Sequence, residues 1–207
     1  MLRILGKRSS INVRKVLWAC VELELPFVQE DWGSGFRDPQ EPAFVALNPN
    51  ATIPVLRDGD FVLWESNSIL RYLANRHDGH TLYPSGPQAR ARVDQWLDWQ
   101  ATELNPSWRY AFLHLVRRSA AHADTAQVAA SLQAWSRCMR ILDTQLERSG
   151  GHVAGPDFSL ADIAVGLSVN RWYETPFAHP ALPAVAAYHA RLRLRPGFLA
   201  HGCNGTP

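Results

Sequence analysis

The chain has 207 residues, 46% of them hydrophobic and 19% charged, which is ordinary for a soluble globular protein and long enough for two small domains. Its formal net charge of +2 is too slight to indicate a nucleic-acid partner, and no apolar run is long enough to span a bilayer. Cys20, Cys138 and Cys203 are widely spaced, so they predict neither a disulfide framework nor a metal site. We expect a cytoplasmic protein with no metal, no membrane contact and no nucleic-acid partner.

The N-terminal part has the pattern of a strand, a helix and a second strand. An apolar run at residues 2–5 predicts a buried strand and lacks the length of a signal-peptide core. Apolar residues then recur at helical spacing over residues 13–21, which predicts an amphipathic helix with Ser10 or Asn12 as its N-cap. Residues 27–31 favour a second strand, and this order of elements predicts a right-handed parallel crossover.

The next stretch combines a proline, a tight turn and a helix start. Pro54 cannot donate to a sheet ladder, so it belongs at the start of a strand that continues over residues 55–57. A turn signal at residues 58–60 predicts a hairpin with residues 61–64. Residues 65–68 supply polar side chains that are typical of a helix N-terminus.

The remaining sequence predicts helices only. Residues 79–87 are rich in turn-forming residues and predict a linker, after which helical periodicity dominates. Pro106 lies inside the first long helical pattern and predicts a kink. Ser159 and Asp162 form an S-x-x-D capping box, and a final helix is expected at residues 184–194. Arg191, Arg193 and Arg195 are expected to form a solvated face.

The segment NPNATIP at residues 48–54, the hairpin, and Glu65-Ser66 at a helix start together resemble the glutathione-binding half of the cytosolic glutathione transferases. The motif of that family is N-P-x-G-x-(V/I)-P, then a hairpin, then E-S. The resemblance implies a thioredoxin-like α/β N-terminal domain at residues 1–78, a linker at residues 79–87 and an all-α helical C-terminal domain at residues 88–207. It also implies a homodimer that uses glutathione as its co-substrate.

The start of the first helix is the reactive position in a thioredoxin-like fold, because the helix dipole and free N–H groups there lower the pKa of a thiol. Thioredoxins carry C-x-x-C at this point, whereas this chain has Ser9-Ser10-Ile11-Asn12, so a thiol must arrive with a substrate. The pattern S-x-N-x-x-K-V, which begins at Ser10, resembles that of a bacterial branch of the family. It implies that Ser10 and Asn12 stabilise the glutathione thiolate, with Ser9 as the fallback, and it leaves open which of them dominates.

The resemblance also assigns the contacts of glutathione. The backbone at Thr52, Ile53 and Pro54 would pair with the peptide. Glu65 would bind the ammonium of the γ-glutamyl residue and Ser66 its carboxylate, which suits the N-terminus of a helix.

The chain departs from the family motif at Thr52. The family usually has a lysine here, close to the glycyl carboxylate of glutathione. Thr52 offers a hydroxyl but no charge, so we expect weaker glutathione binding unless Lys7 or Arg37 compensates.

The second substrate, a hydrophobic electrophile, is expected between the two domains. Trp108, Arg109, Tyr110 and Phe112 are candidate wall residues, although one helical turn cannot point all four at one cleft. The expected function is that of a glutathione transferase, in which the activated thiolate attacks the electrophile. Two alternatives remain open, a glutathione-dependent disulfide reductase or dehalogenase on the same scaffold, and a non-catalytic binding protein that resembles a glutathione transferase.

Overall fold

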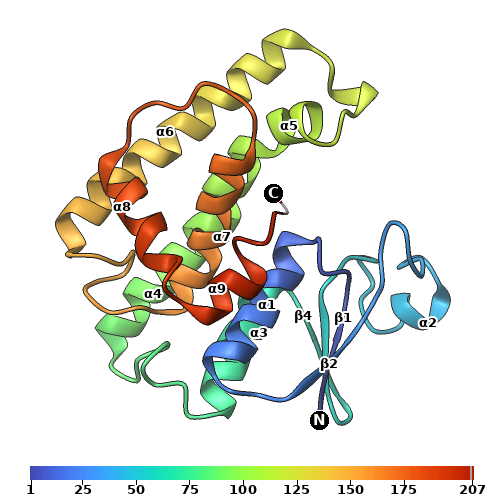
Figure 1. Ribbon diagram of the computed structural model, residues 1–207. Coiled ribbons are helices and arrows are strands. Elements are labelled where there is room, and N and C mark those ends of the chain that lie inside the picture. The colour runs from blue at the N-terminus through green and yellow to red at the C-terminus, as the bar shows by residue number, and fades with distance from the viewer. Residues whose placement is uncertain (206) are drawn as a thin grey trace.

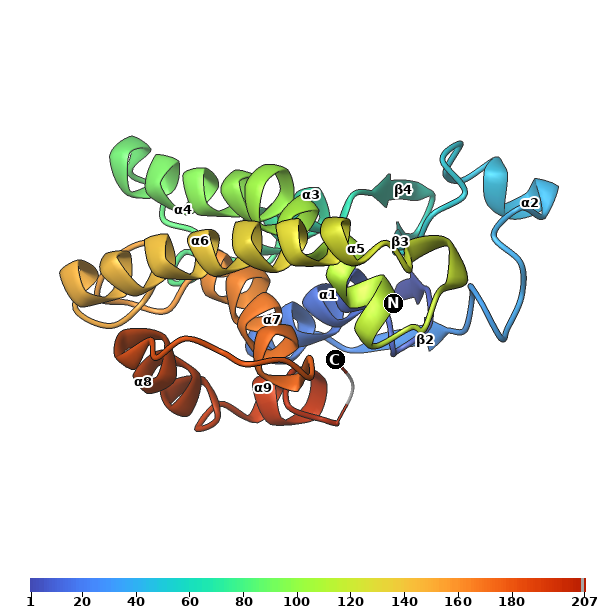
Figure 2. The same ribbon diagram turned by 90° about the horizontal axis from the view of Figure 1, so that it is seen from above.

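The structure, a computed structural model, describes residues 1–205 and 207. A β-sheet with helices on both faces occupies one end of the molecule, and a bundle of helices occupies the other (Figure 1). Helix α1 (Ile11–Glu22) lies between the sheet and the bundle, as the view from above also shows (Figure 2).

The sheet is built from four short runs rich in apolar residues, which are β1 (Leu2–Leu5), β2 (Phe27–Glu30), β3 (Val55–Asp58) and β4 (Phe61–Trp64). Within the described residues the strand order is β2-β1-β3-β4. Strand β1 is parallel to β2 and antiparallel to β3, and β3 is antiparallel to β4. The predicted strands, the parallel crossover through α1 and the hairpin are therefore confirmed.

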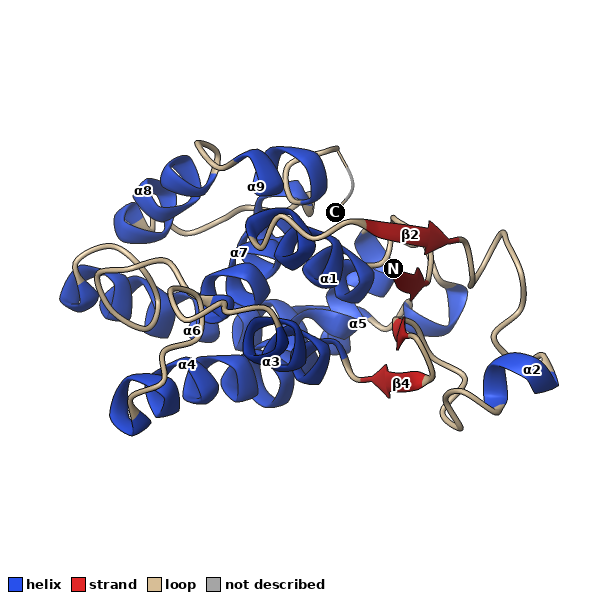
Figure 3. Cartoon of the chain, turned by 90° about the horizontal axis from the view of Figure 1, so that it is seen from below, coloured by secondary structure: helices blue, strands red, loops and turns tan. Residues whose placement is uncertain are grey.

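Apolar side chains on the two faces of the sheet decide which helices cover it. On one face, α1 and α3 (Ser66–Arg76) pack over a buried cluster that includes Ile4 and Leu56. On the other face, the short helix α2 (Pro42–Val45) places the fully buried Phe44 against the sheet. Helix α2 lies at the end of the molecule that is farthest from the bundle (Figure 3).

The second part consists of helices joined by loops. Their bounds are α4 (Pro87–Trp99), the π-helical turn η1 (Gln100–Leu104), α5 (Asn105–Leu115), the short 3₁₀ turn η2 (Ala120–His122), α6 (Thr125–Ser149), α7 (Leu160–Glu174), α8 (Pro183–Leu192) and α9 (Pro196–His201). The predicted capping box is present at the start of α7 between Ser159 and Asp162. Across the described residues, no helix combines the length and the hydropathy that crossing a membrane requires.

The helix expected at residues 184–194 is present as α8, but the prediction that it is the final helix is wrong. Helix α8 ends at Leu192, and Pro196 starts the separate helix α9. A residue that precedes proline is driven out of the helical region by the proline ring, and Arg195 accordingly has the extended angles φ −93° and ψ 126°.

The helical path from α4 to α5 is continuous but irregular. Pro106 lacks an N–H group and its ring crowds the carbonyl four residues earlier, so a regular α-helix cannot run through it. The chain accommodates the proline by the π-helical turn η1, which comes directly before Asn105. The π-helical turn brings Gln100 into a fully buried position.

Contacts of α1 join the two parts of the molecule. Trp18 is fully buried, with its ring centroid 5.8 Å from Phe158 and 5.1 Å from Phe198. Glu22 accepts hydrogen bonds from Arg195 at 3.0 Å (Nε) and 2.6 Å (Nη2). The guanidinium of Arg195 also stacks 3.6 Å from the ring of Phe158. Placing Arg195 on a solvated face was therefore wrong, because tertiary folding brings it to Glu22.

Substitution of Gly197 tests this packing. A methyl group on Gly197 would lie 2.3 Å from Cδ1 of the buried Trp18, so Gly197→Ala must displace α9. We expect a loss of about 1–3 kcal/mol in the free energy of unfolding, measured by chemical denaturation. The control is Gly155→Ala, where the added methyl meets no described atom within 4 Å and stability should stay near that of the wild type. Equal stability of the two variants would contradict the packing argument.

Candidate functional site

A cavity of about 690 Å³ opens between the start of α1 and one face of α5, and we call it the α1–α5 cavity. The sequence-predicted residues that line it are Ser9, Ser10, Asn12, Ile53, Trp108, Arg109 and Phe112. The structure thus brings the expected catalytic residues, one expected glutathione contact and the expected second-substrate wall to one place. The other expected glutathione contacts lie outside the lining, namely Thr52, Pro54, Glu65 and Ser66.

The start of α1 presents polar groups that the fold itself leaves unused. Ser10 is the N-cap residue, and within the described chain its hydroxyl makes no capping hydrogen bond to the helix. The Oδ1 atom of Asn12 is buried and has no hydrogen-bond partner among the described residues. A buried polar atom without a partner costs about 1–3 kcal/mol, and a ligand that supplies the partner recovers that energy.

The cysteines of the chain are unsuited to act as nucleophiles at this position. Cys20 is fully buried on the core side of α1, and burial raises the pKa of its thiol to about 12. Burial also raises the pKa of Cys138. Neither residue lines the α1–α5 cavity, and Cys203 does not line it either. A thiol at the start of α1 must therefore come from a bound molecule.

The start of α3 has unusual backbone geometry. Glu65 precedes the helix with φ 70° and ψ 110°, a conformation that costs energy in a residue with a Cβ and is concentrated at ligand sites. The side chain of Glu65 is exposed, whereas Ser66 is buried with 5% exposure. The hydroxyl of Ser66 accepts a hydrogen bond from Lys15 on α1, at 3.4 Å. The two helix starts are therefore connected, although Glu65 and Ser66 do not line the cavity itself.

Lys15 is the centre of a buried polar network. Its side chain is 1% exposed, and its Nζ donates to Ser66 Oγ, to Asn67 Oδ1 at 3.1 Å and to Gln100 Oε1 at 2.7 Å. Gln100 in turn donates from Nε2 to Ser168 Oγ on α7, at 3.1 Å. The three acceptors match the three N–H groups of an ammonium. Burial nevertheless lowers the pKa of Lys15 to about 7.

The segment before β3 is fixed by Asn48. Its Nδ2 donates to the carbonyl oxygen of Thr52 at 2.8 Å and to the Thr52 hydroxyl at 3.2 Å. The peptide bond between Ile53 and Pro54 is cis. The side chain of Thr52 is exposed and uncharged at the position where the family motif usually has lysine.

Weaker glutathione binding was expected unless Lys7 or Arg37 compensates for Thr52, and of these two residues only Lys7 lines the cavity. Lys7 lines the α1–α5 cavity, and its Nζ donates to the carbonyl of Ser34 at 3.0 Å. Arg37 stacks 3.7 Å from the ring of Trp32 and pairs with Glu41 at 3.1 Å. Lys7 is therefore the better placed of the two to face a ligand in the cavity.

The wall on α5 is aromatic. Trp108 and Phe112 are 8% and 4% exposed and meet edge to face, with ring centroids 5.5 Å apart. Arg109 is exposed at the same wall, whereas Tyr110 points away and accepts a hydrogen bond from the Asp124 N–H at 3.3 Å. Three of the four candidate wall residues thus line the cavity, consistent with the geometry of one helical turn.

Arg117 and Arg171 also line the cavity, although the sequence did not predict them there. The network of Lys15 was not predicted either. Arg171 lies on α7, whose residues 160–172 are all buried. The sequence feature that could have identified Arg171 is a lone arginine in an apolar helical stretch, because a buried cation needs a partner.

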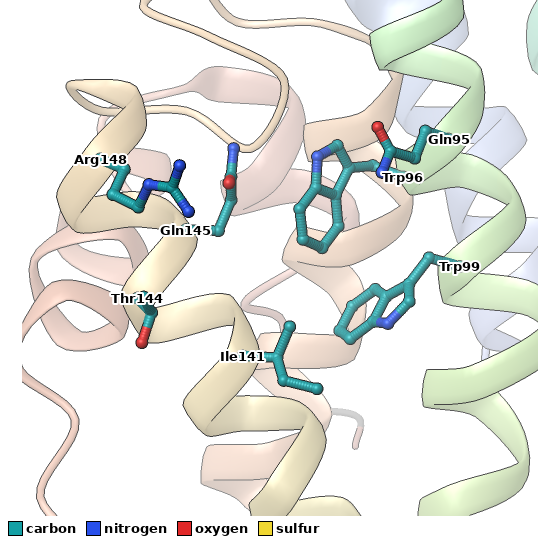
Figure 4. A pocket seen from close by; sticks show the side chains of 7 residues that line it. All are labelled: Gln95, Trp96, Trp99, Ile141, Thr144, Gln145 and Arg148. Atoms are coloured by element: carbon teal, nitrogen blue, oxygen red, sulfur yellow. The ribbon is translucent and has the colours of Figure 1, made fainter.

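Another groove, of about 440 Å³, lies between α4 and α6 (Figure 4). The side chains drawn there are Gln95, Trp96, Trp99, Ile141, Thr144, Gln145 and Arg148. Aromatic rings line this groove, but neither the start of α1 nor the start of α3 contributes to it. In the described part of the chain, no cluster of three or more His, Cys, Asp or Glu residues is placed to hold a metal ion.

Comparison with known proteins agrees with this arrangement. A family model described as "Glutathione S-transferase, N-terminal domain" matches residues 9–76. The chain is 32% identical over 198 residues to glutathione S-transferase GstB of Escherichia coli, with 95% of each chain covered. It is 32% identical over 206 residues to glutathione S-transferase 3 of Zea mays, covering 95% of this chain and 91% of the relative.

A solved structure is also similar over nearly the whole chain. It is the theta class glutathione S-transferase of Xanthomonas axonopodis pv. citri with glutathione bound. The TM-score is 0.92 with 37% identity, covering 97% of this chain and 96% of the other. The fold and the cavity thus define a thioredoxin-like protein with a helical second part, as expected from the sequence. The chain belongs to the glutathione S-transferase family.

The buried lysine makes a prediction about pH. In the folded protein Lys15 has a pKa of about 7, below its ordinary value of 10.5. Between these values the unfolded chain binds the extra proton, so this residue makes the free energy of unfolding rise with pH over that window. In Lys15→Met the rise between about pH 7 and about pH 10 should be smaller than in the wild type, measured by denaturation at each pH.

The control for this experiment is Lys7→Met, which removes the other lysine of the chain. Lys7 lies outside the hydrogen-bond network of Lys15, so its variant should keep the rise that Lys15 causes. An unchanged slope in Lys15→Met would show that the buried amine does not titrate in this range.

Proposed function

We propose that this glutathione S-transferase binds glutathione across the starts of α1 and α3 and activates its thiol for attack on an electrophile in the α1–α5 cavity. The observation that carries the proposal is the start of α1, where Ser10 and Asn12 line the cavity and none of the three cysteines does. In this proposal residues 1–78 form the glutathione-binding domain, residues 79–87 the linker, and residues 88–207 the helical domain that holds the second substrate.

Glutathione is held as an extended peptide. The backbone at Thr52, Ile53 and Pro54 pairs with its cysteinyl residue, and Asn48 supports this assignment because it fixes the loop. Ser66 donates its hydroxyl hydrogen to the γ-glutamyl carboxylate. That hydrogen is available because the oxygen already accepts from Lys15, and donation from an ammonium polarises the hydroxyl further.

The other end of the γ-glutamyl residue is its ammonium. Glu65 is exposed and ionisable at the start of α3, which suits a cationic partner. The glycyl carboxylate lies toward Lys7, which supplies the charge that Thr52 lacks.

The thiol of glutathione then lies at the N-terminus of α1. A free thiol has a pKa of about 8.5, and each unit by which it falls corresponds to about 1.4 kcal/mol of thiolate stabilisation. Hydrogen bonds from Ser10 and from the amide of Asn12, together with the helix dipole, lower it by roughly two units, so that thiolate dominates at neutral pH. The sulfur attacks the electrophilic carbon and the leaving group departs with its electron pair.

We further propose a cytoplasmic homodimer that takes a hydrophobic electrophile. The aromatic wall of Trp108 and Phe112 supports the nature of the electrophile. The half-buried rings of Trp96 and Trp99 beside Ile141 support the dimer, since two copies related by a two-fold axis would cover this apolar groove.

Removal of the two thiolate donors tests the catalytic assignment. Ser10→Ala and Asn12→Ala should each raise the apparent pKa of the bound thiol and lower kcat/KM for an aryl halide by roughly tenfold below that pKa, the effect of one pKa unit. The measurement is the pH profile of kcat/KM, together with retention of each variant on immobilised glutathione. Full activity in both single variants and in the double variant would refute the assignment.

The same assays separate the alternative functions. Retention on immobilised glutathione without turnover of an aryl halide or a mixed disulfide would indicate a non-catalytic binding protein. Turnover of the mixed disulfide alone would indicate a disulfide reductase.

A charge placed in the α4–α6 groove tests the dimer. Ile141 is 46% exposed in the single chain, so Ile141→Glu should not disturb the core but should oppose a second copy that covers it. We expect a dimer for the wild type and a shift toward monomer for this variant, measured by light scattering. Leu199→Glu on α9, where the side chain is 50% exposed, is the control and should remain dimeric. A dimer that is unaffected by Ile141→Glu would place the interface elsewhere.

A further inference from the structure

The lining of the α1–α5 cavity is strongly unbalanced in charge. Among the described residues it contains the cationic side chains Lys7, Arg109, Arg117 and Arg171 and no Asp or Glu. These cations come from the loop after β1, from α5 and the turn that follows it, and from α7. The glycyl carboxylate of glutathione accounts for Lys7, but a wholly apolar electrophile would give the three arginines nothing to bind.

Arg171 is the most buried of these cations, and burying a charge lowers the stability of the fold unless the charge is paired. Its side chain is 4% exposed, and its guanidinium carbon lies 4.4 Å from the ring centroid of Trp108 and 4.1 Å from that of Phe112. Its Nη2 donates to the main-chain oxygen of Pro207 at 3.1 Å. Its Nε is buried and has no hydrogen-bond partner among the described residues.

The neighbours of Arg171 increase its need for an anion. Burial, and then the charges of Arg14 and Arg117, lower the pKa of Arg171 to about 9. Arg14 on α1 donates to the carbonyls of His201 and Gly202, so main-chain dipoles of the C-terminal segment hold it there. A buried cation that faces a cavity and keeps an unused donor is a binding site for an acceptor of negative charge.

We propose that the electrophile carries a carboxylate, which Arg171 binds together with Arg117 while Trp108 and Phe112 hold the apolar body. This inference rests on the proposed function, because it names the substrate class of the same site. The planar fork of arginine matches a carboxylate with two parallel hydrogen bonds, and the aromatic walls exclude water around them. The helix α1 start and the arginines line one cavity, so one molecule reaches both the sulfur and the cations.

The reaction is a nucleophilic displacement on an organic halide. The thiol proton passes to solvent, the thiolate sulfur forms a bond to the carbon that carries the halogen, and the carbon–halogen bond breaks. The halide ion leaves with the bonding electron pair. The products are the glutathione thioether, which keeps the carboxylate, and one halide ion, and no oxidant or reductant is needed.

The test uses two aryl halides that differ only in charge. A chloronitrobenzoate, with chlorine para to the acyl group and the nitro group beside the chlorine, is compared with the matching chloronitrobenzamide. For each, kcat/KM is divided by the uncatalysed rate with glutathione, which removes the difference in intrinsic reactivity. We expect the wild type to favour the benzoate by about tenfold, the size of one charge-assisted hydrogen bond.

The variants are chosen to isolate the cations of the cavity. Arg171→Met and Arg117→Gln should each reduce the benzoate-to-benzamide preference by about tenfold. Arg117 is exposed, so its variant keeps the test informative if Arg171→Met does not fold. Arg118→Gln is the matched control, because Arg118 is the adjacent exposed arginine that does not line the cavity, and it should keep the preference of the wild type.

The outcomes separate this inference from the proposed function. Turnover of both compounds with no preference, or a preference that survives in Arg117→Gln and Arg171→Met, overturns the carboxylate site alone. Turnover of the uncharged chlorodinitrobenzene with neither member of the pair accepted also overturns it alone. Failure to turn over any aryl halide overturns the proposed function and this inference with it.

Discussion

The buried ammonium of Lys15 is the interaction on which the architecture of the site depends. It donates to Ser66 and Asn67 at the start of α3 and to Gln100 in the π-helical turn. Gln100 in turn donates a hydrogen bond to Ser168 on α7. Each acceptor is itself buried, so loss of any member would leave polar groups unpaired away from water. Farther along α1, Trp18 and the pair of Glu22 with Arg195 fix the same helix to the bundle. The sheet and the bundle are therefore held in one relative position around α1.

A fixed α1 has a consequence for chemistry. The dipole and the free N–H groups of a helix start stabilise negative charge only when the helix is held at the place where that charge develops. Here the start of α1 carries a hydroxyl and an amide, and the nearest thiol of the helix, Cys20, is buried with its pKa raised to about 12. The same scaffold that runs dithiol exchange in thioredoxins thus needs a ligand that supplies sulfur, which agrees with membership of the glutathione S-transferase family.

Residues from both parts of the molecule line the α1–α5 cavity. The sheet-bearing part contributes the helix start, Ile53 and Lys7, which are suited to a peptide with a thiol. The helical part contributes Trp108, Phe112 and Arg171, which set the shape and charge of the remaining space. Because the Lys15 network connects both, the distance between a sulfur on α1 and a group bound at Arg171 is set by the fold rather than by the substrate. In the proposed function, selection of the electrophile therefore lies with residues that are remote in sequence from Ser10 and Asn12.

Local patterns determined much of this protein. Short apolar runs and the turn at Gly59 specified the strands and their hairpin. Ser10 or Asn12 marked the start of α1, and the Ser159 box marked the start of α7. These features could be predicted because each depends on residues within a few positions of one another. The separation of α9 at Pro196, the pairing of Arg195 with Glu22, the burial of Lys15 and the aim of Arg171 into the cavity were decided only by the tertiary structure. Each of these depends on the direction of a side chain toward a partner far along the chain, and local sequence does not specify that direction.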